Sequence, residues 1–285
     1  MSIDRRRLIV SALLAAGFAL MYWHVFAKLV HDWWTDDNYS HVFLIIPIAL
    51  YLAWERRRAF ADAPLRLSIF GLIVVIGSIA VLLAGILGAE LFLTRISILG
   101  TVAGSVLFLF GWRRLRILAF PLAFLFLMIP LPAIIFNQIA FPLQLFASRV
   151  GELALTTVDI PVLREGNVLI LANTSLEVAE ACSGIRSLVS LLTLGIVFGY
   201  FADQRGWVRA LIALSTIPIA VITNGARVAG TGVAAHQFGP GAAEGFLHEF
   251  SGWVIFVLAF MMIITLQWLL VRLVPPRTPA VPAVT

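Results

Sequence analysis

The sequence predicts an all-α integral membrane protein with about eight transmembrane helices. Of its 285 residues, 61% are hydrophobic and 12% are charged, and the mean hydropathy is +1.01. So few polar side chains cannot cover the surface of a soluble globule. Because one crossing takes about 20 apolar residues, the chain has room for about eight crossings and one modest loop region, but not for a separate soluble domain.

Eight apolar stretches recur along the chain. They cover residues 8–30, 41–54, 67–88, 91–112, 117–136, 183–201, 208–233 and 252–273. Each is long enough, or nearly long enough, to cross the hydrocarbon as a helix. The second stretch is short for a crossing, so a locally thinned bilayer or a re-entrant segment is the alternative for it.

The basic residues predict the orientation of these helices. Arginine clusters stand between the apolar stretches, and all of them fall on one side if every stretch crosses. These are Arg5, Arg6 and Arg7; Arg56, Arg57 and Arg58; Arg113, Arg114 and Arg116; Arg205 and Arg209; and Arg272 and Arg277. The positive-inside rule assigns that side, with both chain termini, to the cytoplasm. The net charge of +5 and the pI near 10.1 therefore reflect topology and not nucleic-acid binding.

The longest loop on the outer side runs over residues 137–182. It begins with an amphipathic stretch over residues 141–152, which we expect to lie in the membrane interface. Two β-prone runs follow, at Val168–Leu171 and 176–178, separated by turn-forming residues, and they predict a small β-hairpin before the sixth helix. Residues 1–274 are expected to form one membrane domain, and the Pro-rich tail 275–285 is expected to be disordered.

Cys182 is the only cysteine, which excludes an intrachain disulfide and a multi-cysteine metal site. It lies in residues 180–186 (EACSGIR), at the outer end of the sixth helix, where Glu180 and Arg186 are supporting candidates. The positive end of a helix dipole and a nearby guanidinium both favour a thiolate. The alternative is an inert thiol packed between helices.

Arg227 lies late in the seventh apolar stretch, in residues 224–227 (NGAR). Counted from Ala210 at about 1.5 Å per residue, it reaches the outer edge of the hydrocarbon, the level expected for Cys182. Arginine at that depth is costly unless it is partnered, so it is a functional candidate. Asn224, one turn earlier, is placed to orient the guanidinium. The alternative is a side chain that snorkels to the outer headgroups.

His248, in residues 248–253 (HEFSGW), opens the eighth helix on the same outer side. Imidazole is the most frequent acid–base group in catalysis and the usual partner of a cysteine nucleophile. A lone interfacial histidine that only makes hydrogen bonds is the alternative. Taken together, three helices bring a nucleophile, a cation and a proton shuttle to one expected depth, which is a set for acyl transfer.

Other candidates carry less information. His41, at the outer end of the second stretch, is a candidate substrate contact, although a solvated helix cap explains it equally well. Arg95, inside the fourth stretch, is expected to pair with the nearby Glu90. No zinc, P-loop or dinucleotide-binding signature occurs, so we expect neither a metal nor a cofactor.

At these residues the chain resembles the exosortase and archaeosortase family of multi-spanning membrane proteins. The resemblance covers most of the chain and is sharpest at residues 180–186, 224–227 and 248–253. It implies a cysteine protease and transpeptidase with a Cys182–Arg227–His248 site, in a bacterial inner membrane and facing the periplasm. The implied partners are exported proteins that end in a short motif, a membrane helix and a basic tail, together with an acceptor that the sequence does not identify.

Two functions of other classes remain open at this point. A transporter or lipid flippase would use Arg95, Arg227 and the Gly/Pro-interrupted helices as a translocation path. Such a path calls for charges near the bilayer midplane, whereas Cys182, Arg227 and His248 are expected at one face. A membrane glycosyltransferase for surface polysaccharide would need outer carboxylates, which Asp36 and Asp37 could supply.

Overall fold

The computed structural model describes residues 5–36, 39, 41–172, 174–178, 185–239, 241 and 246–274. It divides into two compact units, Met1–Ala133 (unit 1) and Ile134–Thr285 (unit 2), and we describe each by itself. The expected tail over 275–285 lies outside the described residues. The division does not test whether residues 1–274 form one membrane domain, which stays a prediction.

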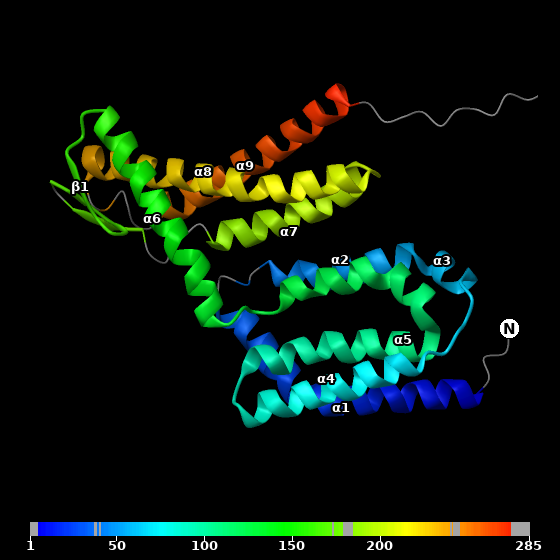
Figure 1. Cartoon of the computed structure of the whole chain (residues 1–285). Coiled ribbons are helices and arrows are strands. Elements are labelled where there is room, and N and C mark those ends of the chain that lie inside the picture. The colour runs from blue at the N-terminus through cyan, green and yellow to red at the C-terminus, as the bar shows by residue number, and fades with distance from the viewer. Residues whose placement is uncertain are drawn as a thin grey trace, which may run out of the picture. The chain divides into compact units, whose positions relative to one another are not determined.

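Unit 1 is an assembly of apolar helices. Its elements are α1 (Arg5–Thr35), α2 (Val42–Glu55), α3 (Arg57–Asp62), α4 (Ile69–Leu87), α5 (Leu91–Phe124) and the short 3-10 helix η2 (Leu125–Met128). Helices α4 and α5 pack closely along their length (Figure 1) because small residues face each other between them. A Cβ atom at Gly71 would lie 2.2 Å from the backbone nitrogen of Phe108, so only glycine permits this approach.

Helix α5 consists of two arms joined at Gly111, where φ is +82°. Asp32 pairs with Arg95 near the start of the first arm, and Nε1 of the adjacent Trp33 donates to the carbonyl of Met128 (3.0 Å) just after the second arm. The chain therefore reverses at Gly111 and returns to the end from which it came. We expected two helices here, over 91–112 and 117–136. The break instead falls at Gly111, and the second arm ends at Phe124, ahead of Pro130 and Pro132.

Arg56 and Arg114 lie at the end of unit 1 that is opposite to Asp32. At one end, Arg56 donates to the carbonyl of Ile117 (2.8 Å) and Arg114 to the carbonyl of Ala63 (2.9 Å). At the other end, Asp32 lies beside the first turns of α5. Arginines that gather at one end are the pattern that the positive-inside rule describes for a cytoplasmic side, and that orientation stays a prediction.

Arg95 is only 4% exposed, and its ion-pair partner is Asp32 of α1. Lys28 also pairs with Asp32, at 2.9 Å. The expected pairing of Arg95 with Glu90 is wrong, because the Glu90 side chain caps α5 by accepting from the backbone N–H of Leu93 (2.9 Å). A carboxylate at an N-cap satisfies a helix donor that otherwise has no intrahelical acceptor.

Unit 2 contains four helices and a small sheet. The helices are α6 (Ala133–Thr157), which begins at the unit boundary, α7 (Ile185–Ala202), α8 (Gly206–Phe238) and α9 (Phe246–Leu273). Three of the helices pack side by side, and the fourth, α6, packs with the sheet. Helices α7, α8 and α9 lie side by side (Figure 1) and share an apolar cluster that includes Leu191, Ile212 and Ile263. Both α8 and α9 are longer than expected and begin before residues 208 and 252.

The sheet lies between α6 and α7 in the sequence and has three antiparallel strands in the order β1–β2–β3. The strands are β1 (Val162–Glu165), β2 (Val168–Leu171) and β3 (Ser175–Glu177). The expected hairpin is confirmed as β2 and β3, and β1 is an addition. Gly166, with φ of +65°, and Asn167 form the turn between β1 and β2, a dipeptide typical of two-residue hairpins.

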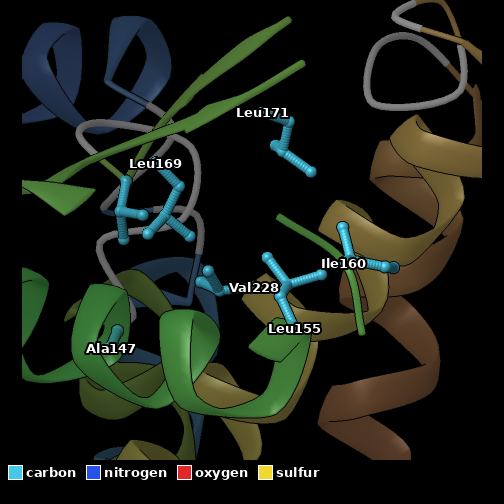
Figure 2. Close-up of a cluster of buried hydrophobic side chains, with 7 residues drawn as sticks. Ala147, Leu155, Ile160, Leu169, Leu171 and Val228 are labelled. Atoms are coloured by element: carbon cyan, nitrogen blue, oxygen red, sulfur yellow. The ribbon is translucent and has the colours of Figure 1, made fainter. Parts of the chain in front are cut away.

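The sheet packs onto α6 and α8 through a second apolar cluster. Figure 2 shows Leu169 and Leu171 from β2 gathered with Ala147 and Leu155 from α6 and with Val228 from α8. Ser148 ties the turn to α6, because its hydroxyl donates to the carbonyl of Gly166 (3.0 Å). Although the amphipathic stretch over 141–152 was expected in the interface, α6 is also long and apolar enough to cross a membrane.

Within the described ranges, six helices are long and apolar enough to cross a membrane. They are Ala12–Thr35, Ile69–Leu87, Leu91–Met128, Ala133–Thr157, Gly206–Phe238 and Phe250–Leu273, and Val42–Glu55 and Ser187–Ala202 are shorter apolar helices. The expectation of a helical, multi-spanning membrane protein with a small sheet is thus confirmed. The number of eight crossings and the cytoplasmic position of both termini stay predictions.

Candidate functional site

Small residues set the antiparallel register of α7 and α8. A Cβ atom at Gly199 would lie 3.3 Å from the carbonyl oxygen of Arg209, and one at Gly195 would lie 2.3 Å from Cγ2 of Thr216. These two contacts fix how the helices are aligned, because a shift by one turn would bring larger side chains against the opposing backbone.

This register brings the start of α7 level with Arg227. Ten residues lead back from Gly195 to Ile185, the first described residue of α7, and eleven lead forward from Thr216 to Arg227. At a rise of 1.5 Å per residue these segments measure about 15 Å and about 16 Å. The N-terminus of α7 and Arg227 therefore lie at nearly the same height along the helix pair.

The guanidinium of Arg227 reaches from α8 to the first turns of α9. Its Nε lies 3.4 Å from the hydroxyl oxygen of Ser251, a long hydrogen bond. A Cβ atom at Gly252 would lie 3.3 Å from Nη2 and 3.4 Å from Cζ. Gly252 thus leaves the space that the guanidinium occupies, and Ser251 contributes a neutral oxygen beside it.

Helix α6 packs against α8 on a side different from the one that carries Arg227. A Cβ atom at Gly225 would lie 2.7 Å from a methyl group of Val150. Val228, immediately after Arg227, is buried in the cluster with the sheet (Figure 2). Asn224 is 5% exposed and lies three positions before Arg227, which puts both on one helix face. Packing on both flanks restricts how far this part of α8 can move.

His248 is described only through its backbone, which belongs to the first turn of α9. It lies three positions before Ser251 and four before Gly252. Helical positions with these spacings share a face, so His248 is one turn from the two residues that adjoin Arg227. Ser251 and Gly252 received no role from the sequence, although this spacing from His248 would have indicated one.

Other predicted site residues fall outside what the structure describes. Cys182 and Glu180 lie between Val178 and Ile185, outside the described residues. For Arg186, only its backbone position in α7 is described. Val178, the last described residue before the gap, is buried in the sheet cluster and donates its N–H to the carbonyl of Asn167 (2.8 Å).

His41 belongs to unit 1, at the N-cap of α2. Both of its ring nitrogens are buried. Nearby, burial raises the pKa of Tyr39, and the carboxylate of Asp36 adds to that rise. The expectation that His41 contacts a substrate stays a prediction.

The opposite end of unit 2 has a different electrostatic character. In the loop between α7 and α8, Arg205 donates to both carboxylate oxygens of Asp203. These hydrogen bonds lower the pKa of Asp203 below 3.8. Arg205 also donates to the carbonyl of Val274, which follows α9. At this end of unit 2 the charges of Asp203 and Arg205 therefore neutralise each other. Some 20 residues of α8 separate this pair from Arg227.

The described part of the chain contains no candidate metal-binding site. No three His, Cys, Asp or Glu side chains gather there closely enough to hold a metal ion. Among the described side chains named here, Arg227 carries the charge, and a guanidinium can bind a carboxylate or another oxyanion through paired hydrogen bonds.

Comparison with known proteins yields one match. A family model described as transmembrane exosortase matches residues 33–265. This range includes α2 to α8 and most of α9, and therefore both units. Searches of curated proteins and of solved structures found no match.

Proposed function

The chain belongs to the transmembrane exosortase family, and on that premise we propose that it is a membrane cysteine protease and transpeptidase. Its substrates are exported proteins that end in a short motif, a membrane helix and a basic tail. The reaction takes place at the outer interface of the inner membrane. Cys182 is the nucleophile, Arg227 stabilises negative charge, and His248 transfers the proton.

The observation that carries this proposal is the position of Arg227. Its guanidinium lies against Ser251 and Gly252, one turn from His248 in sequence, and level with the start of α7. Cys182 precedes Ile185 by three residues, and three residues of any conformation span at most about 11 Å. The chain itself thus limits how far the thiol can lie from the helix end that is level with Arg227.

The chemistry follows from the three side chains. His248 takes the thiol proton, and the Cys182 thiolate attacks the carbonyl carbon of the scissile peptide bond. Arg227 donates to the oxyanion that forms, because stabilising this charge usually contributes most to the acceleration of acyl transfer. The C–N bond then breaks, His248 returns the proton to the leaving amine, and a thioester remains. Water or an acceptor amine attacks the thioester and releases the thiol.

Arg186, Asn224 and Glu180 support this set. Asn224 shares a helix face with Arg227 and is buried, which suits a residue that orients the guanidinium. Arg186 follows Cys182 by four residues, and a nearby cation favours the thiolate. Glu180 precedes the nucleophile by two residues and is proposed to assist from the same segment.

A transporter has less support than an enzyme. Arg95, which a translocation path would use, is 4% exposed and neutralised by Asp32. A charge held by a carboxylate of its own unit has little left to offer a passing solute. No corresponding observation favours a glycosyltransferase.

Thioester trapping tests the proposed nucleophile. The full chain is co-expressed with a candidate substrate from the same genome, one that carries the motif, membrane helix and basic tail. We expect a substrate shortened at its C-terminus and a covalent adduct that hydroxylamine releases. With Cys182→Ala, both products should disappear because no thiolate remains to attack.

Ser183→Ala is the matched control, since it changes the adjacent residue by one oxygen atom. It should process the substrate at nearly the wild-type rate. Size-exclusion chromatography in detergent would check that each variant folds. Normal maturation of the substrate by well-folded Cys182→Ala would show that Cys182 is not the nucleophile.

A further inference from the structure

A cavity of about 610 Å³ lies at the arginine-rich end of unit 1. The extended segment 64–68 forms one wall, with Arg66 and Leu67, and the other wall consists of Phe110, Trp112 and Arg113 around the break in α5. None of these residues belongs to the proposed catalytic set, which lies in unit 2. The volume is within the range of small-molecule sites, roughly 300–1,000 Å³.

Backbone contacts around Gly111 hold the two walls of this cavity together. At Gly111 the backbone adopts a φ of +82°, and an added Cβ atom would lie 2.1 Å from the carbonyl oxygen of Arg66. The backbone N–H of Ser68 donates to the carbonyl of Phe108 (3.3 Å). The linker therefore runs directly over the helix break, and these contacts fix both walls relative to each other.

The two arginines of the cavity differ from their neighbours. Arg56 and Arg114 both donate to backbone carbonyls, and Arg114 also lies over the ring of Phe60, 4.9 Å from its centroid. Within the part of the chain that the structure describes, the side chains of Arg66 and Arg113 make no hydrogen bond or ion pair. Two exposed guanidiniums that line one cavity repel each other, and an anion between them would relieve that repulsion.

Apolar side chains extend from the mouth of the cavity. Leu67 and Ile69 are each 71% exposed. Phe70 and Trp112 stack with their ring centroids 5.8 Å apart, and tryptophan is enriched where hydrocarbon meets headgroups. The cavity thus joins a positively charged part to an apolar surface at the level expected of the membrane interface.

We propose that this cavity binds the headgroup of an anionic phospholipid. The phosphate lies between Arg66 and Arg113, whose planar guanidiniums match phosphate oxygens in pairs. The acyl chains run along Leu67 and Ile69. Because the same arginines would repel a basic peptide, the tail of a sorting signal does not fit the cavity. The site holds unit 1 at the leaflet richest in anionic lipid.

Native mass spectrometry of the full chain in detergent tests this site. Phosphatidylglycerol and phosphatidylcholine with identical acyl chains are added at equal concentration. For the double variant Arg66→Gln/Arg113→Gln, we expect phosphatidylglycerol binding to weaken by about tenfold or more, as two cation–anion contacts are lost. Phosphatidylcholine binding should not change. Undiminished phosphatidylglycerol binding in this variant would overturn the proposal.

Arg58→Gln/Arg116→Gln is the matched control, because it removes the same charge from exposed residues at the same end that do not line the cavity. It should bind phosphatidylglycerol within about twofold of the wild type. An equal loss in both double variants would mean that net charge, and not the cavity, attracts the lipid. If the glutamine variant does not fold, Arg66→Lys/Arg113→Lys should keep weakened binding, and unweakened binding there would contradict paired recognition by guanidinium.

Inorganic phosphate distinguishes a lipid from a soluble anion as the source of the phosphate group. Millimolar phosphate should not displace phosphatidylglycerol, because it cannot use the apolar surface at Leu67 and Ile69. Displacement at concentrations comparable to that of the lipid would assign the cavity to a soluble phosphate compound and reject the lipid.

Discussion

Two arginines within membrane helices show how the same side chain serves different purposes in the two units. Arg95 in unit 1 is 4% exposed and pairs with the Asp32 carboxylate, which Lys28 also contacts. Arg227 in unit 2 is half-buried and lies 3.4 Å from the neutral hydroxyl of Ser251, with Gly252 leaving room for its guanidinium. The first arginine joins two helices, whereas the second presents its charge beside the start of α9.

The difference suggests a way to distinguish arginines that stabilise the fold from arginines that take part in catalysis. A carboxylate partner neutralises an arginine and fixes its geometry, so removal of either residue leaves a poorly solvated charge. A hydroxyl beside an arginine, such as that of Ser251, can orient the guanidinium without neutralising it. We therefore expect substitutions at Arg95 to affect stability and substitutions at Arg227 to affect catalysis.

The largest effect is expected for Arg227→Lys. Lysine keeps the charge but not the forked donor that can hold an oxyanion. Loss of one oxyanion donor lowers catalytic rates by about 10²- to 10³-fold, so substrate cleavage should fall by about 100-fold with the apparent Tm nearly unchanged. Cleavage rates and thermal unfolding in the same detergent would be measured. Full activity would reduce Arg227 to a membrane anchor.

The next effect is expected for Arg95→Met, and it concerns stability. Breaking a buried ion pair from one side costs about 3–5 kcal/mol, and we expect the lower end because Asp32 keeps Lys28 as a partner. The free energy of unfolding would be measured in mixed micelles. The double variant Arg95→Met/Asp32→Asn should recover part of the loss, since Asp32, which keeps only Lys28 as a partner in the single variant, no longer carries a charge. No recovery would mean that packing, and not charge, explains the cost.

The positions of the helices were easier to predict from the sequence than the contacts between residues that are far apart in it. Long apolar stretches and arginine clusters predicted the membrane helices, because hydropathy dictates that level of structure. The prediction from the sequence placed the break in α5 after residue 112, and it gave Arg95 the wrong partner, Glu90. Both errors concern tertiary contacts: the break at Gly111 lies directly against the carbonyl oxygen of Arg66, and Asp32 is 63 residues from Arg95. Local patterns carry no information on such pairings.

The candidate site was likewise only partly predictable from the sequence. The motifs around residues 224–227 and 248–253 predicted that Arg227 and the start of the eighth helix would meet at one depth, and Ser251 does adjoin Arg227. The roles of Ser251 and Gly252 did not emerge, because a serine and a glycine in a helix look like ordinary packing residues. Their spacing from His248 was the available signal, and the position of the guanidinium beside them identifies them. The role of Cys182 stays a prediction.

A smaller effect is expected from the residues that hold Arg227 in place. Gly252→Ala would bring a methyl group to 3.3 Å from Nη2 and displace the guanidinium by a few tenths of an ångström. We expect about a tenfold loss of kcat, because small misplacements of catalytic groups are costly. Ser251→Ala should lose less, since its hydrogen bond is long at 3.4 Å.

Steady-state kinetics on these two variants would separate positioning from folding. In each, KM and the apparent Tm should stay near the wild-type values while kcat falls. Gly195→Ala is the contrasting variant: its methyl group would lie 2.3 Å from Thr216, far from Arg227, and should lower Tm. If Gly252→Ala lowers only Tm, Gly252 serves helix packing alone.

The smallest effect is expected for Asp203→Asn, which tests whether a carboxylate partner makes an arginine structural near the surface as well. Hydrogen bonds from Arg205 lower the pKa of Asp203 below 3.8. A carboxyl group with a depressed pKa in the folded state adds stability above its unfolded pKa and loses it as the pH falls through the folded value. The apparent Tm of the wild type should therefore exceed that of Asp203→Asn slightly at neutral pH, and the difference should shrink as the pH falls below the ordinary pKa of an aspartate carboxyl group. Substrate cleavage at neutral pH should stay within about twofold, because the ion pair lies at the opposite end of α8 from Arg227 and distant sites act nearly independently. A large loss of cleavage with unchanged Tm would reverse the assignment and give the paired arginine a functional role.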